Sequence, residues 1–520
     1  MGAVSALLRL VGVAFAFLRY GVVSAAGDAP YAPPTLTLAG RLTRPFAASK
    51  WRAKGPGARL AAALEALGPA YVKLGQLLAT RPDIVGVRVA GELSALQDRL
   101  TPFPEETAQR IVADSLGQPV ADVFETFGPP VAAASVAQVH RARLKDGTDV
   151  AVKILRPGIR ARCAREMRSL FVGARLVERL SKTSRRLEPV KLIETLDASL
   201  RLELDLRLEA AGASEISDAS TGSGQLRVPE MHWSYARSDV IVMEWIEGDR
   251  IDDLAALDAR GVDRKALADA VMRGFLDLAL NHGCFHADMH QGNLFVDKSG
   301  RLAAVDFGII GRLDKGAQRY LAEILFGFLN RDYPRIAEVH FEAGYVPKRH
   351  SVAAFAQALR AVGEPLFGRN ASAIAMSSVL MQLFEVTDLF DMRLRPELVL
   401  LQKTMVAVEG VCRQLDPEHN MWRASRPIVE AWMTDRLGPP AHLRAVGDNA
   451  VTVGRALQNL PEMLRKAELA ADVISEDGLR VDGASIQALS EAQAKGAAAT
   501  RRAVWAATAA VAALALTQIL

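Results

Sequence analysis

Two short motifs constrain the fold of this chain more than any other feature. One contains Asp288 and the other Asp306, 18 residues later. The first, FHADMHQGNLFV (285–296), places Asn293 five positions after Asp288 on a tight loop that leads into a strand pattern. The second, AVDFGIIG (304–311), centres on Asp306. Phosphoryl transfer needs a carboxylate near the attacking hydroxyl or water and oxygen ligands for magnesium. The pattern predicts that Asp288 orients the acceptor, and that Asn293 and Asp306 bind Mg2+.

The histidines of the first motif leave a metal-site interpretation open. His286 and His290 are spaced as a pair of metal ligands could be. No third ligand is evident nearby, and magnesium prefers oxygen to imidazole nitrogen. The phosphoryl-transfer interpretation is therefore favoured.

A lysine on an apolar strand adds a third piece. The runs VAQVHRARL and DVAVKIL flank a hairpin-turn signal at 145–148, and Lys153 lies on the second run. A lysine in such surroundings needs a partner, and Glu209 in the helical stretch LRLELDLRLEAAG is a candidate. A strand lysine held by a helix glutamate points at nucleotide phosphates in kinases. Taken alone, Lys153 could equally be a solvated edge-strand residue.

A run of small residues precedes this hairpin. The segment PPVAAASVAQVH (129–140) contains Ala132, Ala133, Ala134 and Ser135, which let a backbone approach a ligand closely. Backbone N–H groups of such a turn can hold phosphate oxygens. By itself, an alanine run is usually an ordinary turn or helix, so this signal is weak.

The strand pattern at 240–248 is predicted to connect two lobes. By position, backbone groups from Glu244 to Ile246 would face an adenine ring. Several nucleotide signatures are missing from the sequence: the Gly-rich G-x-G-x-x-G loop, the A-P-E triplet and the Walker A loop. Their absence argues against a conventional protein kinase and against direct flavin or nicotinamide chemistry.

Patterning elsewhere is mainly helical. Helices are expected over 59–127, with a break at Arg81-Pro82, over 160–216, and from 248 to about 475. Strands are expected at 226–232, 239–245, 293–296 and 302–305, and the Pro- and Gly-rich segment 27–58 is expected to be a linker or arm. Half the residues are apolar, which excludes general disorder, and a net charge of +4 gives no support for nucleic-acid binding. The three cysteines share no short spacing, which argues against a disulfide framework or zinc site.

Both ends of the chain indicate a membrane. Residues 1–60 carry eight basic side chains and one acidic one, and they open with an apolar run that Arg9 and Arg19 interrupt. An interfacial helix fits this run better than a spanning one, although a signal peptide remains an alternative. After Arg502 there are 18 uncharged residues, just enough to cross a bilayer. A short amphipathic or oligomerising helix is the alternative for this tail.

These motifs, in this order, resemble those of the UbiB-type atypical kinases, a ubiquinone-biosynthesis family of the protein-kinase-like superfamily. The most specific match is the K-x-G-Q motif formed by Lys73 and Gln76, and Glu203 and Asp205 match the family's E-x-D. The similarity covers roughly 60–430. The chain departs from the family in having Ala137 where Gly often precedes Gln, and in having one clear apolar tail segment rather than two.

The resemblance implies an α+β, bilobal protein-kinase-like fold with an N-terminal helical extension and a C-terminal membrane helix. The expected parts are a basic membrane-proximal segment with a linker (1–58), the extension with the K-x-G-Q motif (59–128), the N-lobe (129–247), the C-lobe (248–430), a helical region (431–500) and a transmembrane helix (501–520). In the family, the K-x-G-Q helix covers the site where a protein substrate would bind. Lys73, Gln76, Glu203 and Asp205 would then gate the nucleotide.

The implied function is an ATPase or kinase that uses ATP and Mg2+ to handle isoprenoid quinone precursors for ubiquinone synthesis. Expected partners are membrane lipid, these precursors and other enzymes of the pathway, with no nucleic acid; a homodimer is also compatible. The expected location is a bacterial-type inner membrane, with the catalytic part on the cytoplasmic side. Two alternatives remain open, a nucleotide-binding scaffold without catalysis and a small-molecule phosphotransferase.

Overall fold

The computed structural model describes residues 2–27, 34–79, 81–93, 96, 101–180, 188–221, 224–367, 382, 386, 389–392 and 395–437. All except Leu437 belong to one compact unit, Met1–Arg436, and the second unit is Leu437–Leu520. The expected helical region 431–500 is therefore described only as far as Leu437. The expected membrane helix at 501–520 lies outside the described residues.

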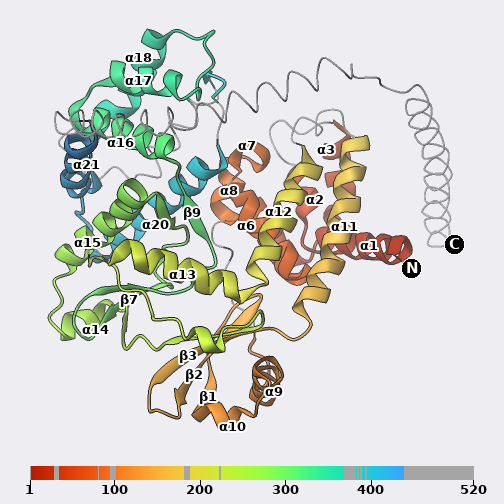
Figure 1. The fold of residues 1–520 in the computed structure, drawn as a ribbon. Coiled ribbons are helices and arrows are strands. Elements are labelled where there is room, and N and C mark those ends of the chain that lie inside the picture. The colour runs from red at the N-terminus through yellow and green to blue at the C-terminus, as the bar shows by residue number, and fades with distance from the viewer. Residues whose placement is uncertain are drawn as a thin grey trace, which may run out of the picture. The chain divides into compact units, whose positions relative to one another are not determined.

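An antiparallel sheet forms the N-lobe (Figure 1). Its strands are adjacent in the order β1 (Phe124–Ala133), β2 (Ala137–Leu144), β3 (Asp149–Leu155) and β4 (Val240–Glu244). The predicted hairpin is confirmed as β2 and β3, and the N–H of Leu144 donates to the Thr148 carbonyl at 2.9 Å. Alternate residues of a strand face opposite sides of its sheet. Val152 packs toward α9 (Glu105–Leu116), so Lys153 points to the opposite face.

The helical pattern predicted up to about residue 127 is wrong at its end, because β1 begins at Phe124. Phe124 is buried and pairs with Leu144 of β2, so sheet pairing overrides the local pattern. Pro129 and Pro130 are tolerated because β1 is the edge strand, and its register shifts around Pro130.

Three helices cover the face of the sheet to which Lys153 points. The pattern predicted over 160–216 is confirmed as α11 (Ile159–Leu180), α12 (Pro189–Glu203) and α13 (Leu206–Ser220). Residues of all three share a buried apolar cluster with Ala151 and Leu155 of β3. Asp205 caps α13 by accepting a hydrogen bond from the Arg207 N–H at 3.2 Å. This cap fixes the start of the helix that carries Glu209.

The part of the chain that precedes the sheet is helical. They are α1 (Gly2–Arg19), α2 (Val22–Gly27), α3 (Pro34–Thr43), η1 (Arg44–Phe46), α4 (Ser49–Arg52), α5 (Pro56–Leu67), α6 (Pro69–Ala79), α7 (Pro82–Val85), α8 (Val87–Leu93), α9 and α10 (Val120–Val123). The linker expected at 27–58 is thus largely helical between 34 and 52. Gly68, with φ +130°, separates α5 from α6. A side chain there would collide with Glu166, so only glycine fits this break.

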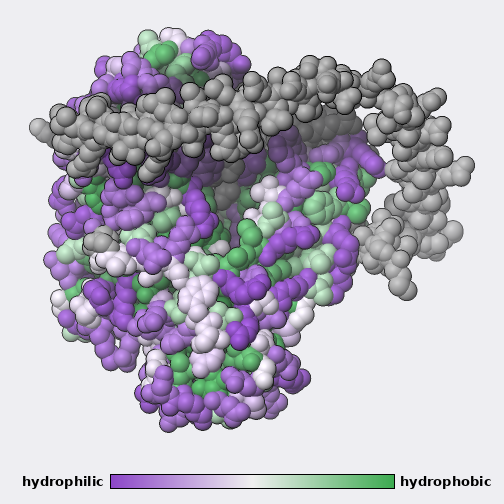
Figure 2. Space-filling view, viewed as in Figure 1, coloured by the Kyte–Doolittle hydropathy of each residue, from purple (hydrophilic) through white to green (hydrophobic). Residues whose placement is uncertain are grey.

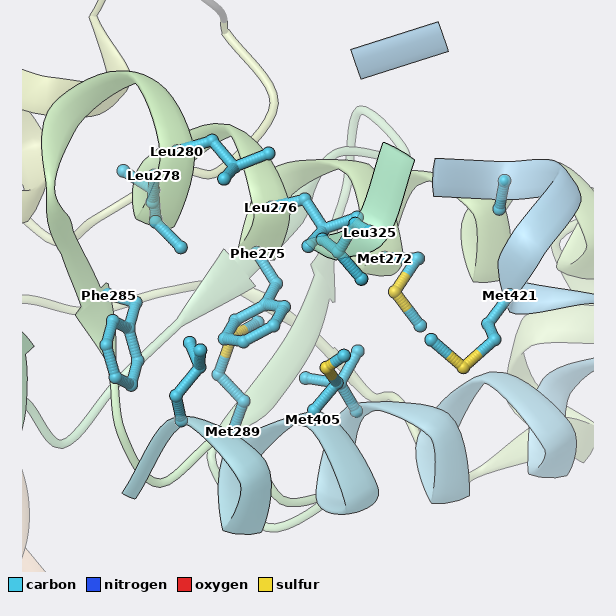
Figure 3. Packing of buried hydrophobic residues seen from close by; sticks show 14 of the residues in the cluster. Met272, Phe275, Leu276, Leu278, Leu280, Phe285, Met289, Leu325, Met405 and Met421 are labelled. Carbon is cyan, nitrogen blue, oxygen red and sulfur yellow. The ribbon is translucent and has the colours of Figure 1, made fainter. Parts of the chain in front are cut away.

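The C-lobe combines small sheets with helices. Strands β5 (Gly248–Arg250), β7 (Leu294–Asp297) and β8 (Leu302–Ala304) form one sheet, and β6 (Cys284–His286) pairs with β9 (Ile310–Arg312). The helices are α14 (Leu254–Ala259), α15 (Arg264–Asp277), η4 (Leu278–His282), α16 (Lys315–Asn330), α17 (Tyr333–Glu342), α18 (Val352–Gly363), η5 (Glu364–Phe367), α20 (Pro396–Leu415) and α21 (Met421–Leu437), whereas η3 (Trp233–Tyr235) precedes β4 in the N-lobe. Their largest buried cluster joins α15, β6 and α20 (Figure 3).

Length and hydropathy decide whether any of the described helices could span a membrane. Within the described ranges, no helix combines the length and apolar character needed to cross a bilayer. Figure 2 shows a mainly hydrophilic face with smaller hydrophobic areas among the polar side chains.

An arginine links the two lobes. The Arg227 guanidinium contacts Glu244 at the end of β4, and its Nη1 lies 2.7 Å from Oδ2 of Asp297 on β7. Asp297 is buried and also accepts hydrogen bonds from the N–H groups of Ser299 and Arg301, each at 2.9 Å. Burial alone would raise the pKa of Asp297, but these hydrogen bonds and that from Arg227 lower it well below its usual value.

We expect the substitution Asp297→Asn to lower the free energy of unfolding by about 2 kcal/mol at pH 7, because it removes charge-assisted hydrogen bonds. A carboxylate with a lowered folded pKa stabilises the fold above its usual pKa, and this contribution is lost as the pH falls. The difference from the wild type should therefore shrink below about pH 4. Urea denaturation at pH 7 and in acid tests this. Asp258→Asn, in an exposed ion pair with Arg264, is the control that should change little. A loss that does not depend on pH would contradict the argument.

Candidate active site

Lys153 lies at the centre of the candidate site. Its Nζ is 2.6 Å from Oε1 of Glu209 on α13 and 3.0 Å from Oδ1 of Asp306. Lys153 and Glu209 are both buried, whereas 45% of the Asp306 side chain is exposed. The predicted partnership of Lys153 with Glu209 is present, and the edge-strand interpretation of Lys153 does not hold, since β3 lies between β2 and β4.

The charges of this cluster are coupled. Burial alone would lower the pKa of Lys153, but Asp306 and Glu209 raise it well above its usual value. Burial raises the pKa of Glu209 to about 7, although Lys153 opposes this shift. Lys153 also holds the pKa of Asp306 at about 2, against the effect of burial. Asp306 is therefore the carboxylate that stays ionised and can meet a cation.

His286 positions the loop that carries Asp288. Its Nδ1 accepts a hydrogen bond from the Asp288 N–H at 3.1 Å, which leaves Nε2 as the donor to the Val305 carbonyl, also at 3.1 Å. The ring is buried and lies 5.0 Å from that of Phe307. Both ring nitrogens are engaged, so the geometry favours a positioning role for His286 over metal binding.

The loop also orients Asn293, which is buried. Its side-chain Nδ2 donates to the Asp288 carbonyl at 3.1 Å, and its main-chain carbonyl accepts a hydrogen bond from the Val305 N–H at 2.9 Å. These bonds hold the Asn293 backbone beside Val305, the residue before Asp306, and fix the amide of its side chain. An amide oxygen and a carboxylate are ligands that magnesium prefers, so the donor set of Asn293 and Asp306 fits Mg2+.

Asp306 adopts an uncommon backbone conformation with φ 64°. Non-glycine residues occupy this left-handed region at an energetic cost and do so mainly where the surroundings hold them. Here Phe307 is buried directly after Asp306, and Lys153 binds the carboxylate from the other side. The strained residue is thus held with its carboxylate beside Lys153.

The alanine run forms the turn between β1 and β2. Ala132 and Ala133 belong to β1, and the Ala134 N–H donates to the Ala137 carbonyl at 2.8 Å. Arg156 braces this turn, because its Nε donates to the Ala134 carbonyl at 2.8 Å. Ser135 is buried within the turn. The Ala134 N–H is therefore used within the turn, which removes it from the predicted phosphate-binding groups.

The predicted lobe connection follows β4. The Glu244 N–H donates to the Glu230 carbonyl at 2.8 Å, and its side chain pairs with Arg227. Ile246 is buried two residues later. The Glu244 side chain thus joins the lobes, and the adenine contact predicted for the backbone from Glu244 to Ile246 stays a prediction.

The K-x-G-Q motif lies on α6. Lys73 forms an ion pair with Glu203 at the end of α12, and Gln76 lies half-buried one turn later. The charge of Lys73 also helps to lower the pKa of Asp306, after the larger contribution of Lys153. The motif helix therefore reaches the neighbourhood of the Lys153 cluster.

Packing explains the glycine of this motif. A Cβ on Gly75 would lie 2.5 Å from a methyl group of Leu96 and 2.8 Å from one of Leu64, so a larger residue would require these side chains to move. Asp205, predicted to act with Glu203, instead bonds Arg207, with Oδ2 2.6 Å from Nη2. Of this pair, Glu203 contacts Lys73 and Asp205 caps α13.

Sequence reasoning missed two residues that contact the site although they lie far from its motifs along the chain. Glu166 of α11 accepts a hydrogen bond from the Ala70 N–H at 2.9 Å and so holds the start of α6. Lys403 of α20 lies 3.7 Å from Oδ1 of Asp288. Both residues sit in ordinary helical patterns, which give no signal of these contacts.

Comparison with known proteins supplies an independent view. The family model of the ABC1 atypical kinase-like domain matches residues 95–340, and that of the UbiB helical domain matches 359–420. Curated relatives include a probable protein kinase UbiB of Pseudomonas fluorescens, 40% identical over 84% of this chain and 83% of that protein. One of Cellvibrio japonicus is 42% identical over 84% of this chain and 79% of that protein. A solved complex of Rv3197 with erythromycin from Mycobacterium tuberculosis is 24% identical with a TM-score of 0.49, over 68% of this chain and 90% of that one.

Proposed function

Because the chain belongs to the UbiB family of ABC1 atypical kinase-like proteins, we propose that it binds ATP with Mg2+ and couples ATP hydrolysis to ubiquinone biosynthesis. Its cargo would be isoprenoid quinone precursors at a membrane. The observation that carries this proposal is the position of Lys153 between Glu209 and Asp306. A buried cation shared by two carboxylates is poised to exchange one of them for a phosphate.

Each residue of the site then has a distinct role. Glu209 holds Lys153 toward the α- and β-phosphates, while the turn from Ala132 to Ser135 covers them. Asn293 and Asp306 would hold Mg2+, which neutralises phosphate charge when bound. Asp288 accepts the proton of the attacking water or hydroxyl.

The K-x-G-Q helix supports hydrolysis rather than peptide phosphorylation. The pairing of Lys73 with Glu203 ties α6 to α12, and the Ala70 contact to Glu166 ties it to α11. A helix held at both points leaves little freedom to admit a polypeptide beside Asp306. Gln76, on the same helix, would contact the nucleotide together with Lys73.

The surface of the N-terminal helices supports action at a membrane. Val11 and Phe15 of α1 are exposed, as are Leu38 and Leu42 of α3 and Phe46 of η1. Basic residues of the same segment would attract anionic head groups. We propose a location at the cytoplasmic side of a bacterial inner membrane. Contacts with other enzymes of the pathway, and a homodimer, remain expectations.

The proposal is tested by Mg2+-dependent ATP hydrolysis of the full-length protein, with and without anionic liposomes and a phenolic quinone-precursor analogue. We expect lipid or phenol to stimulate hydrolysis, and Asp288→Asn to lower it about 10- to 100-fold, because general-base assistance is lost. Nucleotide binding without turnover under every condition would instead favour the scaffold function. A phosphorylated soluble metabolite would favour a small-molecule phosphotransferase.

A further inference from the structure

A lysine of α20, a helix of the C-lobe, reaches the loop of Asp288. Lys403 on α20 has its Nζ 3.7 Å from Oδ1 of Asp288, although the two residues lie 115 positions apart. Both side chains are partly exposed, at 41% and 37%. Exposed ion pairs contribute little to stability, so folding energetics do not explain this position.

The neighbours of Lys403 fix α20 against the loop. The Thr404 hydroxyl is buried and lies within hydrogen-bond distance of two carbonyls, that of Ala287, the residue before Asp288, at 3.0 Å and that of Leu400 within α20 at 2.9 Å. Met405 of α20 and Met289 of the loop belong to the same buried cluster (Figure 3). Two consecutive contacts therefore bind α20 to both sides of Asp288, and they leave Lys403 at the solvent-accessible edge.

The loop itself carries no permanently charged cation. The segment FHADMHQGNLFV contains neither lysine nor arginine. The exposed ring of His290 accepts a hydrogen bond from the Gly292 N–H at 2.9 Å through Nδ1, and its Nε2 lies 3.6 Å from Oδ2 of Asp288, so His290 faces one carboxylate oxygen and Lys403 the other. Transfer of a phosphoryl group builds negative charge beside the acceptor, and positioned ammonium groups stabilise such charge. The separation of 3.7 Å is longer than a hydrogen bond, so Asp288 leaves the ammonium donors of Lys403 available to an anion.

We propose that Lys403 binds the terminal phosphate of the nucleotide next to Asp288, so that α20 completes the active site. This inference rests on the proposed ATP-dependent function and adds α20 to the residues that bind the nucleotide. In this proposal α20 contacts the terminal phosphate directly, in addition to packing in the core of the C-lobe.

The test compares the affinities of the full-length Lys403→Met variant and the wild type for MgATP and for MgADP. We expect MgATP to bind about tenfold more weakly, MgADP to change less than about twofold, and turnover to fall at least about tenfold. Lys403→Arg should keep most of the preference for MgATP. Lys265→Met, on the exposed surface of α15, is the matched control and should match the wild type.

A chemical rescue separates charge from structure. The three native cysteines are buried, so a thiol introduced by Lys403→Cys is the accessible target for alkylation with bromoethylamine. The aminoethylated protein should regain the preference for MgATP. Equal weakening of MgATP and MgADP, or no rescue after complete alkylation, would overturn the inference while the proposed function stands. Absence of nucleotide binding by the wild type would overturn both.

Discussion

Replacement of Asp306 by Asn is expected to lower Mg2+-dependent ATP turnover by about 100- to 1,000-fold with only a small loss of stability. Asparagine keeps the shape of the side chain but removes the negative charge that would face Mg2+. The loss of stability should be small because 45% of the Asp306 side chain is exposed and Glu209 still pairs with Lys153. The charge of Asp306 contributes to the raised pKa of Glu209, so its removal leaves Glu209 in a balanced pair with Lys153.

Turnover at saturating ATP, Mg2+ titrations and thermal melts of the same preparations check this expectation. Asp218→Asn is the control, since Asp218 is exposed on α13, the same helix that carries Glu209. The variant should also need more Mg2+ for half-maximal turnover. Wild-type turnover at low Mg2+ would contradict the assignment of Asp306, whereas a large drop in melting temperature would indicate a structural role.

The central residues of the site could be predicted because each lies in a short local pattern. Lys153 follows from strand alternation beside a hairpin turn, and Asp288 and Asn293 follow from a fixed spacing on one loop. Their approach to Asp306 is also local, since the adjacent strands β7 and β8 join the loop to Asp306 and pair Asn293 with Val305. The kinase-like mixture of helix and sheet follows from the same motifs.

Contacts between distant segments could not be predicted. The contact of Lys403 with Asp288 depends on which face of α20 meets the loop, and the helical pattern does not specify this. Likewise, the resemblance to the family's E-x-D motif paired Asp205 with Glu203 but did not show that Asp205 caps α13. The start of β1 was missed because pairing with β2, rather than local propensity, determines it.

Replacement of Lys153 is expected to have the second large effect, on both ATP turnover and stability. We expect Lys153→Met to abolish measurable ATP turnover and to lower the free energy of unfolding by about 3–5 kcal/mol at pH 8, because it leaves Glu209 buried without its cation. Burial already raises the pKa of Glu209 to about 7, and loss of Lys153 removes the charge that opposes this shift. A carboxyl group with a raised folded pKa stabilises the fold at low pH, and this contribution is lost as the pH rises through that pKa. The penalty should therefore be largest above pH 7 and shrink toward pH 5.

Urea denaturation across this pH range measures the penalty, and the double variant Lys153→Met with Glu209→Gln provides the control. Neutralising the stranded carboxylate should recover most of the stability at pH 8, because a buried ion pair replaced by neutral groups of similar size is nearly neutral in energy. Turnover should stay absent in the double variant, since the phosphate-binding cation is still missing. A penalty that is the same at pH 5 and pH 8 would contradict the charge argument. Recovery of turnover together with stability would show that Lys153 supports the fold and not the nucleotide.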